Sequence, residues 1–212
     1  LGVNYESGRM ESFVKTSIPW RKRLATSAFS RWRHAQASLH PLTYLFWECT
    51  LRCNLACRHC GSDCQVSARQ PDMALEDFLG VLDRVATISD PAKTMVAITG
   101  GEPLMREDLA ACGRAISERG FPWGMVSNGW ALDQKQLDGL LASGLRSLTI
   151  SLDGLEASRD WLRGKSGSYQ RALAAIRCAS AVPGIAFDVV TCVTPRNMSE
   201  QGSLRTVLLE AG

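Results

Sequence analysis

The sequence contains no long apolar run, no repeat of fixed period and no low-complexity tract. A membrane-spanning helix needs roughly 18–20 consecutive apolar residues, and no run approaches that length. The N-terminus also lacks the basic, then apolar, then small-residue pattern of a signal peptide, so we expect a cytoplasmic protein. With 212 residues, 45% hydrophobic and 21% charged, the composition is that of a globular chain. It argues against collagen, coiled coil and wholesale disorder.

Charge is distributed unevenly along the chain. The net charge is +3, but the first 43 residues hold seven basic and two acidic groups, a balance of +5, and the remainder has a balance of −2. Such a basic segment suits a solvated helix, or binding to nucleic acid, an anionic membrane or an acidic partner. Apolar residues recur at helical spacing between Leu24 and Gln36. We therefore read residues 1–41 as a basic segment with a short solvated helix, and we expect no nucleic-acid partner.

Cysteines are abundant and unevenly placed. Five of the eight fall within sixteen residues: Cys49, Cys53, Cys57, Cys60 and Cys64. A disulfide framework would spread its cysteines over a secreted fold, so thiols crowded together in a cytoplasmic protein indicate metal or cluster ligands. Within this group we read Cys49 as a buried strand residue and Cys64 as a loop thiol. The other three, which fall on predicted helix and strand positions and are expected in the core, are Cys112, Cys178 and Cys192.

The three central cysteines have the spacing Cys53-x3-Cys57-x2-Cys60. Three thiolates this close can hold one face of a soft metal centre. A structural zinc site needs four protein ligands, and Cys64, Cys49 or His59 could supply the fourth. A cubane iron–sulfur cluster with three cysteines instead leaves one iron free for an exogenous ligand. Spacing alone leaves both centres open.

Strands and helices alternate five times from residue 42 onward. Predicted strands cover residues 42–49, 94–98, 123–126, 145–152 and 185–193. Predicted helices cover residues 75–88, 106–119, 133–142, 168–181 and 199–211. This alternation predicts parallel strands joined by crossover helices, an α/β architecture.

Polar or glycine-rich clusters stand at the carboxyl ends of four predicted strands. They are the cysteine loop, Gly100-Gly101-Glu102-Pro103, Ser127-Asn128-Gly129 and Asp153-Gly154. Ligands bind at this edge of open α/β sheets and barrels. The sequence therefore predicts one composite site.

Together these segments resemble the radical S-adenosylmethionine (SAM) superfamily. Cys53-x3-Cys57-x2-Cys60 after the first strand, followed by Gly-Gly-Glu-Pro after the second, carries the resemblance. Ser127-Asn-Gly, Ser151-Leu-Asp-Gly and the segment from Arg159 to Ser168 are similar to the branch that modifies peptides and proteins (the SPASM type). The match covers roughly residues 42–200, and residues 1–41 have no counterpart.

The resemblance implies a partial (β/α)6-type barrel with parallel strands. About five of its six strand–helix units are present in residues 42–212. The sequence ends where a sixth strand would begin, it carries no downstream cysteine-rich extension for auxiliary clusters, and it starts at Leu1. We therefore expect a radical SAM core that is incomplete at its C-terminal end.

By the same resemblance, Cys53, Cys57 and Cys60 hold a [4Fe–4S] cluster, and SAM binds its fourth iron. The reduced cluster cleaves SAM to methionine and a 5′-deoxyadenosyl radical, which abstracts hydrogen from a substrate. The cofactors supply the chemistry, and the protein positions them and excludes water. We expect a peptide or protein substrate and an electron donor such as flavodoxin or ferredoxin.

The Gly-Gly-Glu-Pro segment is expected to contact SAM. Gly100 and Gly101 would let the backbone approach the ligand. Glu102 would offer its carboxylate to the SAM ammonium group, and Pro103 would stiffen the turn.

Other strand ends supply the remaining expected contacts. Ser127 and Asn128 would face the ribose and methionine portions of SAM. Ser151 and Asp153 would hydrogen-bond the ribose, although Asp153 also suits an ordinary turn. Arg163 would clamp the SAM carboxylate, or be a solvated loop charge. His59 takes the place of an aromatic residue beside the third cysteine. No residue reads as a catalytic group beyond the cluster and SAM.

Two other functions fit the sequence. One is a radical SAM enzyme acting on a small molecule in cofactor biosynthesis. The other is a zinc- or cluster-binding module without turnover.

Overall fold

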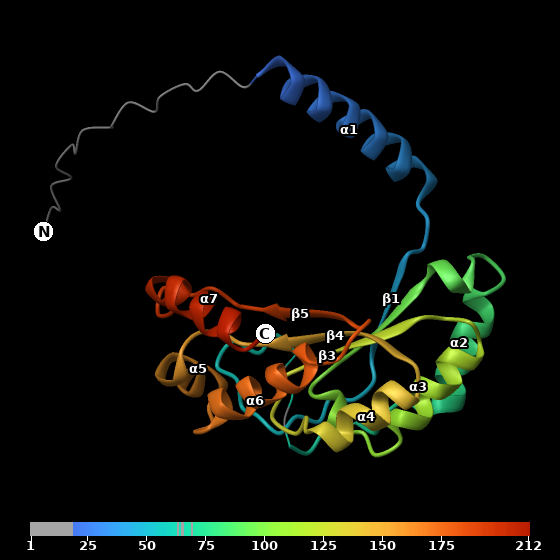
Figure 1. Cartoon of the computed structure of the whole chain (residues 1–212). Helices are drawn as coiled ribbons and strands as arrows, with labels where there is room; N and C mark the ends of the chain where they lie inside the picture. The colour runs from blue at the N-terminus through green and yellow to red at the C-terminus, as the bar shows by residue number, and fades with distance from the viewer. Residues whose placement is uncertain (1–18, 63, 65, 69) are drawn as a thin grey trace, which may run out of the picture. The chain divides into compact units, whose positions relative to one another are not determined.

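The structure is a computed structural model that describes residues 19–212 except residues 63, 65 and 69. The chain divides into two units, residues 1–41 and residues 42–212. Residues 1–18 of the predicted basic segment lie outside the described residues. The rest of the first unit is mainly helix α1 (Trp20–Leu39), which is longer at both ends than the predicted helix (Figure 1).

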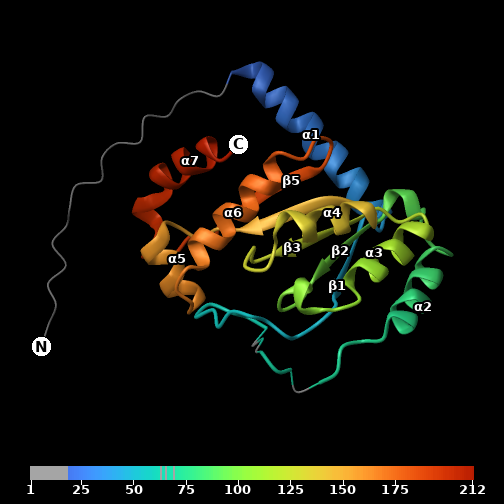
Figure 2. The same cartoon turned by 60° about the horizontal axis from the view of Figure 1, so that its bottom comes forward.

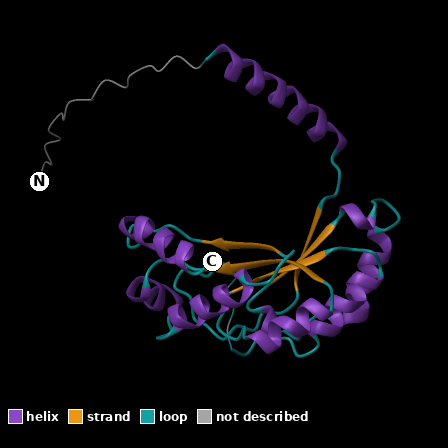
Figure 3. Cartoon of the chain, in the orientation of Figure 1, coloured by secondary structure: helices purple, strands orange, loops and turns teal. Residues whose placement is uncertain are grey.

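Five strands form the sheet of the second unit. They are β1 (Tyr44–Glu48), β2 (Met95–Thr99), β3 (Trp123–Ser127), β4 (Leu145–Ser151) and β5 (Ala186–Val190). All neighbours pair in parallel in the order β1-β2-β3-β4-β5 (Figure 3). This confirms the predicted α/β class, and the sheet is that of a partial barrel.

Helices alternate with the strands along the chain, and α7 follows the last strand. They are α2 (Leu75–Val85), α3 (Leu109–Glu118), α4 (Gln134–Ala142), α5 (Glu156–Arg163), α6 (Ser168–Ser180) and α7 (Gln201–Glu210). Short 3-10 helices cover Pro91–Lys93, Pro103–Met105 and Met198–Glu200. Among the described helices, none is both long enough and apolar enough to cross a membrane.

Local sequence signals account for most helix ends. The Asp133 carboxylate accepts a hydrogen bond from Gln136 N at 2.8 Å, which is the N-cap that the sequence predicts for α4. Helix α5 was missed because its eight residues, EASRDWLR, are largely charged and show no apolar stripe. Gly164, with φ of 66°, ends α5 in the left-handed conformation that favours glycine.

The two faces of the sheet differ because side chains alternate along each strand. One face carries large apolar residues that pack on the helices and are fully buried or nearly so: Val96, Ile98, Trp123, Met125, Leu148 and Ile150. Each such burial stabilises the fold by roughly 1.5–3 kcal/mol. The helices α3, α4 and α6 lie along this face (Figures 1 and 2). The opposite face is left for the site.

Candidate functional site

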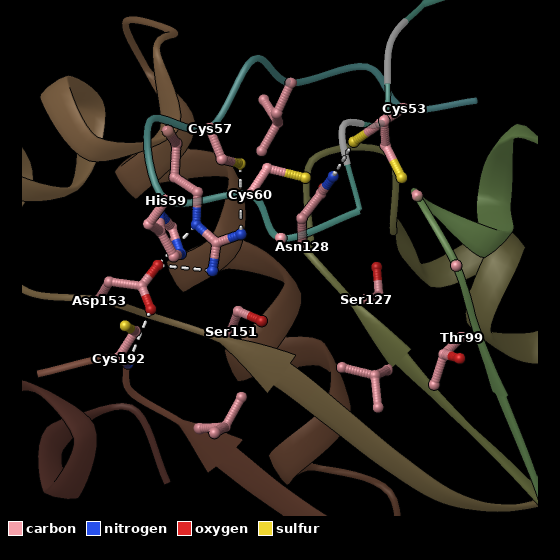
Figure 4. A pocket seen from close by; sticks show the side chains of 18 of the residues that line it. Cys53, Cys57, His59, Cys60, Thr99, Ser127, Asn128, Ser151, Asp153 and Cys192 are labelled. Atoms are coloured by element: carbon pink, nitrogen blue, oxygen red, sulfur yellow. Dashed lines mark hydrogen bonds and ion pairs between the residues drawn. The ribbon is translucent and has the colours of Figure 1, made fainter. Parts of the chain in front are cut away.

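A cavity of about 400 Å³ lies where the strands end. The predicted site residues that line it are Cys53, Cys57, His59, Cys60, Gly100, Gly101, Ser127, Asn128, Ser151, Asp153 and Arg163. Figure 4 shows the cysteine loop above the cavity, with Thr99, Ser127 and Ser151 at the strand ends facing it. The strand-end clusters therefore meet at one place, as the parallel topology predicts.

The cysteine loop is fixed by the end of α5. Arg58 N donates to Leu162 O at 2.8 Å, and Ala56 N donates to Arg163 O at 3.3 Å. A Cβ on Gly164 would overlap the Ala56 carbonyl oxygen, so only glycine allows the two backbones to lie this close. The position of the loop thus depends on a segment more than a hundred residues away in the chain.

The three central thiols differ in exposure. Cys53 is buried, Cys57 is half-buried and Cys60 is exposed. Burial raises the pKa of Cys53 above its ordinary value. A [4Fe–4S] cubane binds each thiolate to a different iron, so three closely spaced cysteines are a donor set that fits such a cluster.

The two glycines serve a contact within the protein. A Cβ on Gly100 would overlap Thr50 O, and a Cβ on Gly101 would overlap Arg52 O. Gly101 N also donates to Thr50 O at 2.8 Å. Both glycines line the cavity, but the space gained by having no side chain is filled by the start of the cysteine loop. The expected approach of SAM to the backbone of these two glycines stays a prediction.

Glu102 and Pro103 lie outside the cavity lining. The Glu102 carboxylate is fully buried and accepts hydrogen bonds from the Ser127 hydroxyl at 2.8 Å and from Asn128 N at 2.7 Å. Burial raises the pKa of Glu102, although these two donors oppose the shift. The carboxylate is therefore already engaged within the protein, and its expected contact with the SAM ammonium stays a prediction. Glu102 thereby joins the end of β2 to the end of β3.

Asn128 faces the cysteine loop. Its Nδ2 donates to Asn54 Oδ1 at 2.8 Å and lies 3.8 Å from Cys53 Sγ, also as a donor. Its Oδ1 accepts a hydrogen bond from Trp130 N at 2.8 Å, which fixes the orientation of the amide.

Arg163 is not a solvated loop charge. It ends α5, and its side chain is 12% exposed. Its Nε donates to Asp153 Oδ2 at 2.6 Å, and its Nη1 donates to Cys57 Sγ at 3.6 Å. Burial alone would lower the pKa of Arg163, but Asp153 and Cys57 raise it above its ordinary value. Asp153 also accepts a hydrogen bond from Cys192 N at 3.0 Å, so its carboxylate is already engaged.

Arg159 has a structural role that sequence reasoning missed. It is fully buried and donates to the carbonyl oxygens of Ser168, Ser151 and Asn128, at 3.1, 2.6 and 2.8 Å. Burial lowers its pKa to about 10, a value at which it still carries its charge at neutral pH. Arg159 therefore ties together the ends of β3 and β4 and the start of α6. In the sequence, the only indication of this role is that Arg159 lies in the same motif-like segment as Arg163.

The remaining cysteines divide into buried and accessible groups. Cys49 and Cys112 are fully buried, and Cys178 packs partly buried against the core. Cys64 is buried and lines the cavity, where burial raises its pKa to about 11. The prediction that Cys192 is a core residue is wrong, because it is exposed and lines the cavity. Strand β5 ends at Val190, and Cys192 continues the alternation of its exposed residues Ala186, Asp188 and Val190.

Comparison with known proteins agrees with this geometry. The family model of the radical SAM superfamily matches residues 47–205. The AdoMet-dependent heme synthase of Methanosarcina barkeri is 32% identical over 73% of this chain and 43% of its own length. The PqqA peptide cyclase of Rhizobium meliloti is 29% identical over 64% of this chain and 36% of its own length. The chain spans less than half the length of these relatives.

A solved structure shares the fold. Streptococcus suis SuiB bound to S-adenosylmethionine has a TM-score of 0.66 and 18% identity, covering 89% of this chain and 44% of SuiB. SuiB has also been solved with its precursor peptide SuiA. The family uses a [4Fe–4S] cluster and SAM, and the cysteine motif stands at the start of the matched residues. The chain belongs to the radical SAM superfamily.

Proposed function

We propose that residues 42–212 are the cluster- and SAM-binding core of a radical SAM enzyme. The observation that carries this proposal is the single cavity in which Cys53, Cys57 and Cys60 meet the polar ends of β2, β3 and β4. When bound, the cluster and SAM supply a carbon radical that removes hydrogen from a substrate.

The chain's own side chains position these groups. Cys53, Cys57 and Cys60 hold the cluster. Ser151 lines the cavity at the end of β4, with a hydroxyl suited to the ribose of SAM. Arg163 lines the cavity, with its Nε held by Asp153 and its Nη1 donating to Cys57. Nη1 carries a second N–H, which suits the SAM carboxylate.

Two substrate classes are proposed, each with its own support. A small-molecule cofactor precursor is favoured by sequence, because the chain is 32% identical to an AdoMet-dependent heme synthase and 31% identical to a pre-heme d1 synthase. A peptide or protein is favoured by the similarity to the PqqA peptide cyclase and by the fold shared with a peptide-binding enzyme. Either class requires an electron donor such as flavodoxin or ferredoxin.

Anaerobic reconstitution with iron and sulfide tests the proposal. We expect a brown protein that, with dithionite and SAM, forms 5′-deoxyadenosine. Cys57→Ala is expected to lose both the colour and the product, whereas Cys178→Ala, matched in residue type but remote from the cavity, retains them. A colourless protein holding one zinc ion, or equal loss from both variants, would overturn the proposal.

The substrate classes are separated by trapping the product. We expect deuterium transfer into 5′-deoxyadenosine from the true substrate when a deuterated porphyrin precursor or a deuterated peptide is supplied. Transfer from the peptide alone would assign peptide modification, and transfer from the porphyrin alone would assign cofactor biosynthesis.

A further inference from the structure

Two hydrogen-bond donors point at the sulfur atoms that would hold the cluster. Arg163 Nη1 donates to Cys57 Sγ at 3.6 Å, and Asn128 Nδ2 donates to Cys53 Sγ at 3.8 Å. Figure 4 draws the contact from Asn128 to Cys53, and the contact to Cys57 beside Asp153. The donors come from different elements, the end of α5 and the loop after β3. Two of the three ligand sulfurs therefore each receive a donor from a separate part of the fold.

Both donor residues are held in place by further hydrogen bonds. The Nε of Arg163 is bound to Asp153, and Asp153 in turn accepts a hydrogen bond from Cys192 N. The backbone of Asn128 is fixed at both ends, because its N–H donates to Glu102 and its carbonyl accepts from Arg159. The Asn128 side-chain amide is itself held by two contacts, because its Oδ1 accepts a hydrogen bond from Trp130 N and its Nδ2 donates to Asn54 Oδ1. Turning either donor away from its sulfur would break such side-chain contacts. The donors are therefore positioned before any cofactor binds.

A donor to a ligand sulfur has a known electrical effect. Reduction adds one negative charge to the cluster, so a donor to its thiolates stabilises the reduced state more than the oxidised state and raises the reduction potential. Arg163 is charged and its side chain is only 12% exposed, so solvent screens its contact with Cys57 weakly, although the paired Asp153 carboxylate offsets part of the charge. Asn128 is neutral, so its effect is smaller.

We propose that Arg163 and Asn128 set the reduction potential of the cluster by donating hydrogen bonds to Cys57 and Cys53. This rests on the proposed function, because it requires that these cysteines hold the cluster. The effect of Arg163 and Asn128 on the cluster does not depend on bound SAM. Asp153 contributes to it, because its hydrogen bond with Arg163 Nε orients the guanidinium.

A redox titration of the reconstituted full chain without SAM tests the inference. Dithionite is the reductant, and the signal of the reduced cluster is followed by electron paramagnetic resonance. For Arg163→Gln we expect about a tenfold fall in the equilibrium constant for reduction, which is 59 mV for one electron. Asn128→Leu is expected to shift the potential in the same direction by less. Arg163→Lys keeps the charge but lacks the fork, and is expected to lie between Arg163→Gln and the unaltered protein.

Arg196→Gln is the matched control. Arg196 is exposed and stacks on Trp161 at 4.4 Å, so this variant also removes one nearby positive charge, without touching a sulfur. An unchanged potential in Arg196→Gln together with the fall in Arg163→Gln supports the inference. Equal shifts in both variants, or no shift in Arg163→Gln at full iron content, would overturn it.

Failure of the proposed function would look different. If the unaltered chain binds no cluster, both conclusions fall together. If it binds a cluster and cleaves SAM while the Arg163 and Asn128 variants keep their potential, only this inference falls. If Arg163→Gln binds too little iron to titrate, Arg163→Lys carries the test, and an unshifted potential there overturns the assignment of Arg163.

Discussion

Replacing Gly164 by alanine is predicted to displace the cysteine loop, although Gly164 is not itself a cluster ligand. Gly164 has a φ of 66°, and a side chain in that left-handed conformation costs about 1–2 kcal/mol. The added Cβ would also overlap the Ala56 carbonyl oxygen, so α5 and the cysteine loop must separate. The hydrogen bonds donated by Ala56 and Arg58 then weaken, at about 0.5–1.5 kcal/mol each. Together these effects lower the free energy of unfolding by about 2–5 kcal/mol.

A second glycine offers a matched control three residues further along. Gly167 has a φ of 79°, but an ideal Cβ there meets no heavy atom within 4 Å. Gly167→Ala should therefore cost only the backbone strain, about 1–2 kcal/mol. The difference between the two variants isolates the contact with the cysteine loop.

The assay is urea unfolding of the apoprotein, together with the iron bound per chain after anaerobic reconstitution. We expect Gly164→Ala to lose more stability than Gly167→Ala and also to bind less iron, while Gly167→Ala keeps its full iron content. Equal losses of stability and of iron in the two variants would show that the backbone contact does not hold the loop, and would refute the reasoning.

Three further predictions concern other buried or accessible groups. Glu102→Ala leaves two buried donors without an acceptor, so the free energy of unfolding in urea should fall by about 2–5 kcal/mol; a loss below 1 kcal/mol would contradict its joining role. Asp160 has a lowered pKa because three donors outweigh its burial. As the pH falls below 3.8, the Asp160 carboxylate becomes protonated in the folded protein and the stability that its hydrogen bonds provide is lost. Over this pH range, Asp160→Asn should therefore lose less stability than the unaltered chain. Cys192 should react with iodoacetamide more slowly when SAM fills the cavity, and Cys112 should not react.

Much of the fold could be predicted because its signals are local. Apolar runs predict the strands, and Asp133 marks a helix start through its own side chain. Parallel topology then brings the strand ends together, so the motifs after β1, β2, β3 and β4 predict one shared cavity without any knowledge of long-range contacts.

The remaining features depend on contacts that no local pattern contains. The motif around Glu102 identifies a carboxylate, but only packing decides that it faces Ser127 and not the cavity. Half of the residues of helix α5 are charged, and two of them, Arg159 and Arg163, contact the strand ends and the cysteine loop. Cys192 was assigned to the core because it falls within an apolar predicted strand, but it shares the exposed alternation of Ala186, Asp188 and Val190.

The contact between Arg163 and Cys57 has a consequence for the order of assembly. These residues are 106 positions apart in the chain, and the loop hydrogen bonds join the same two segments. Closing such a long stretch of chain carries an entropic cost that must be met before the contact can form. During synthesis, the cysteine motif leaves the ribosome well before the segment that shapes it. Delivery of iron and sulfide is therefore expected to follow folding of the sheet as far as α5, because an earlier cysteine loop would have no fixed form to receive them.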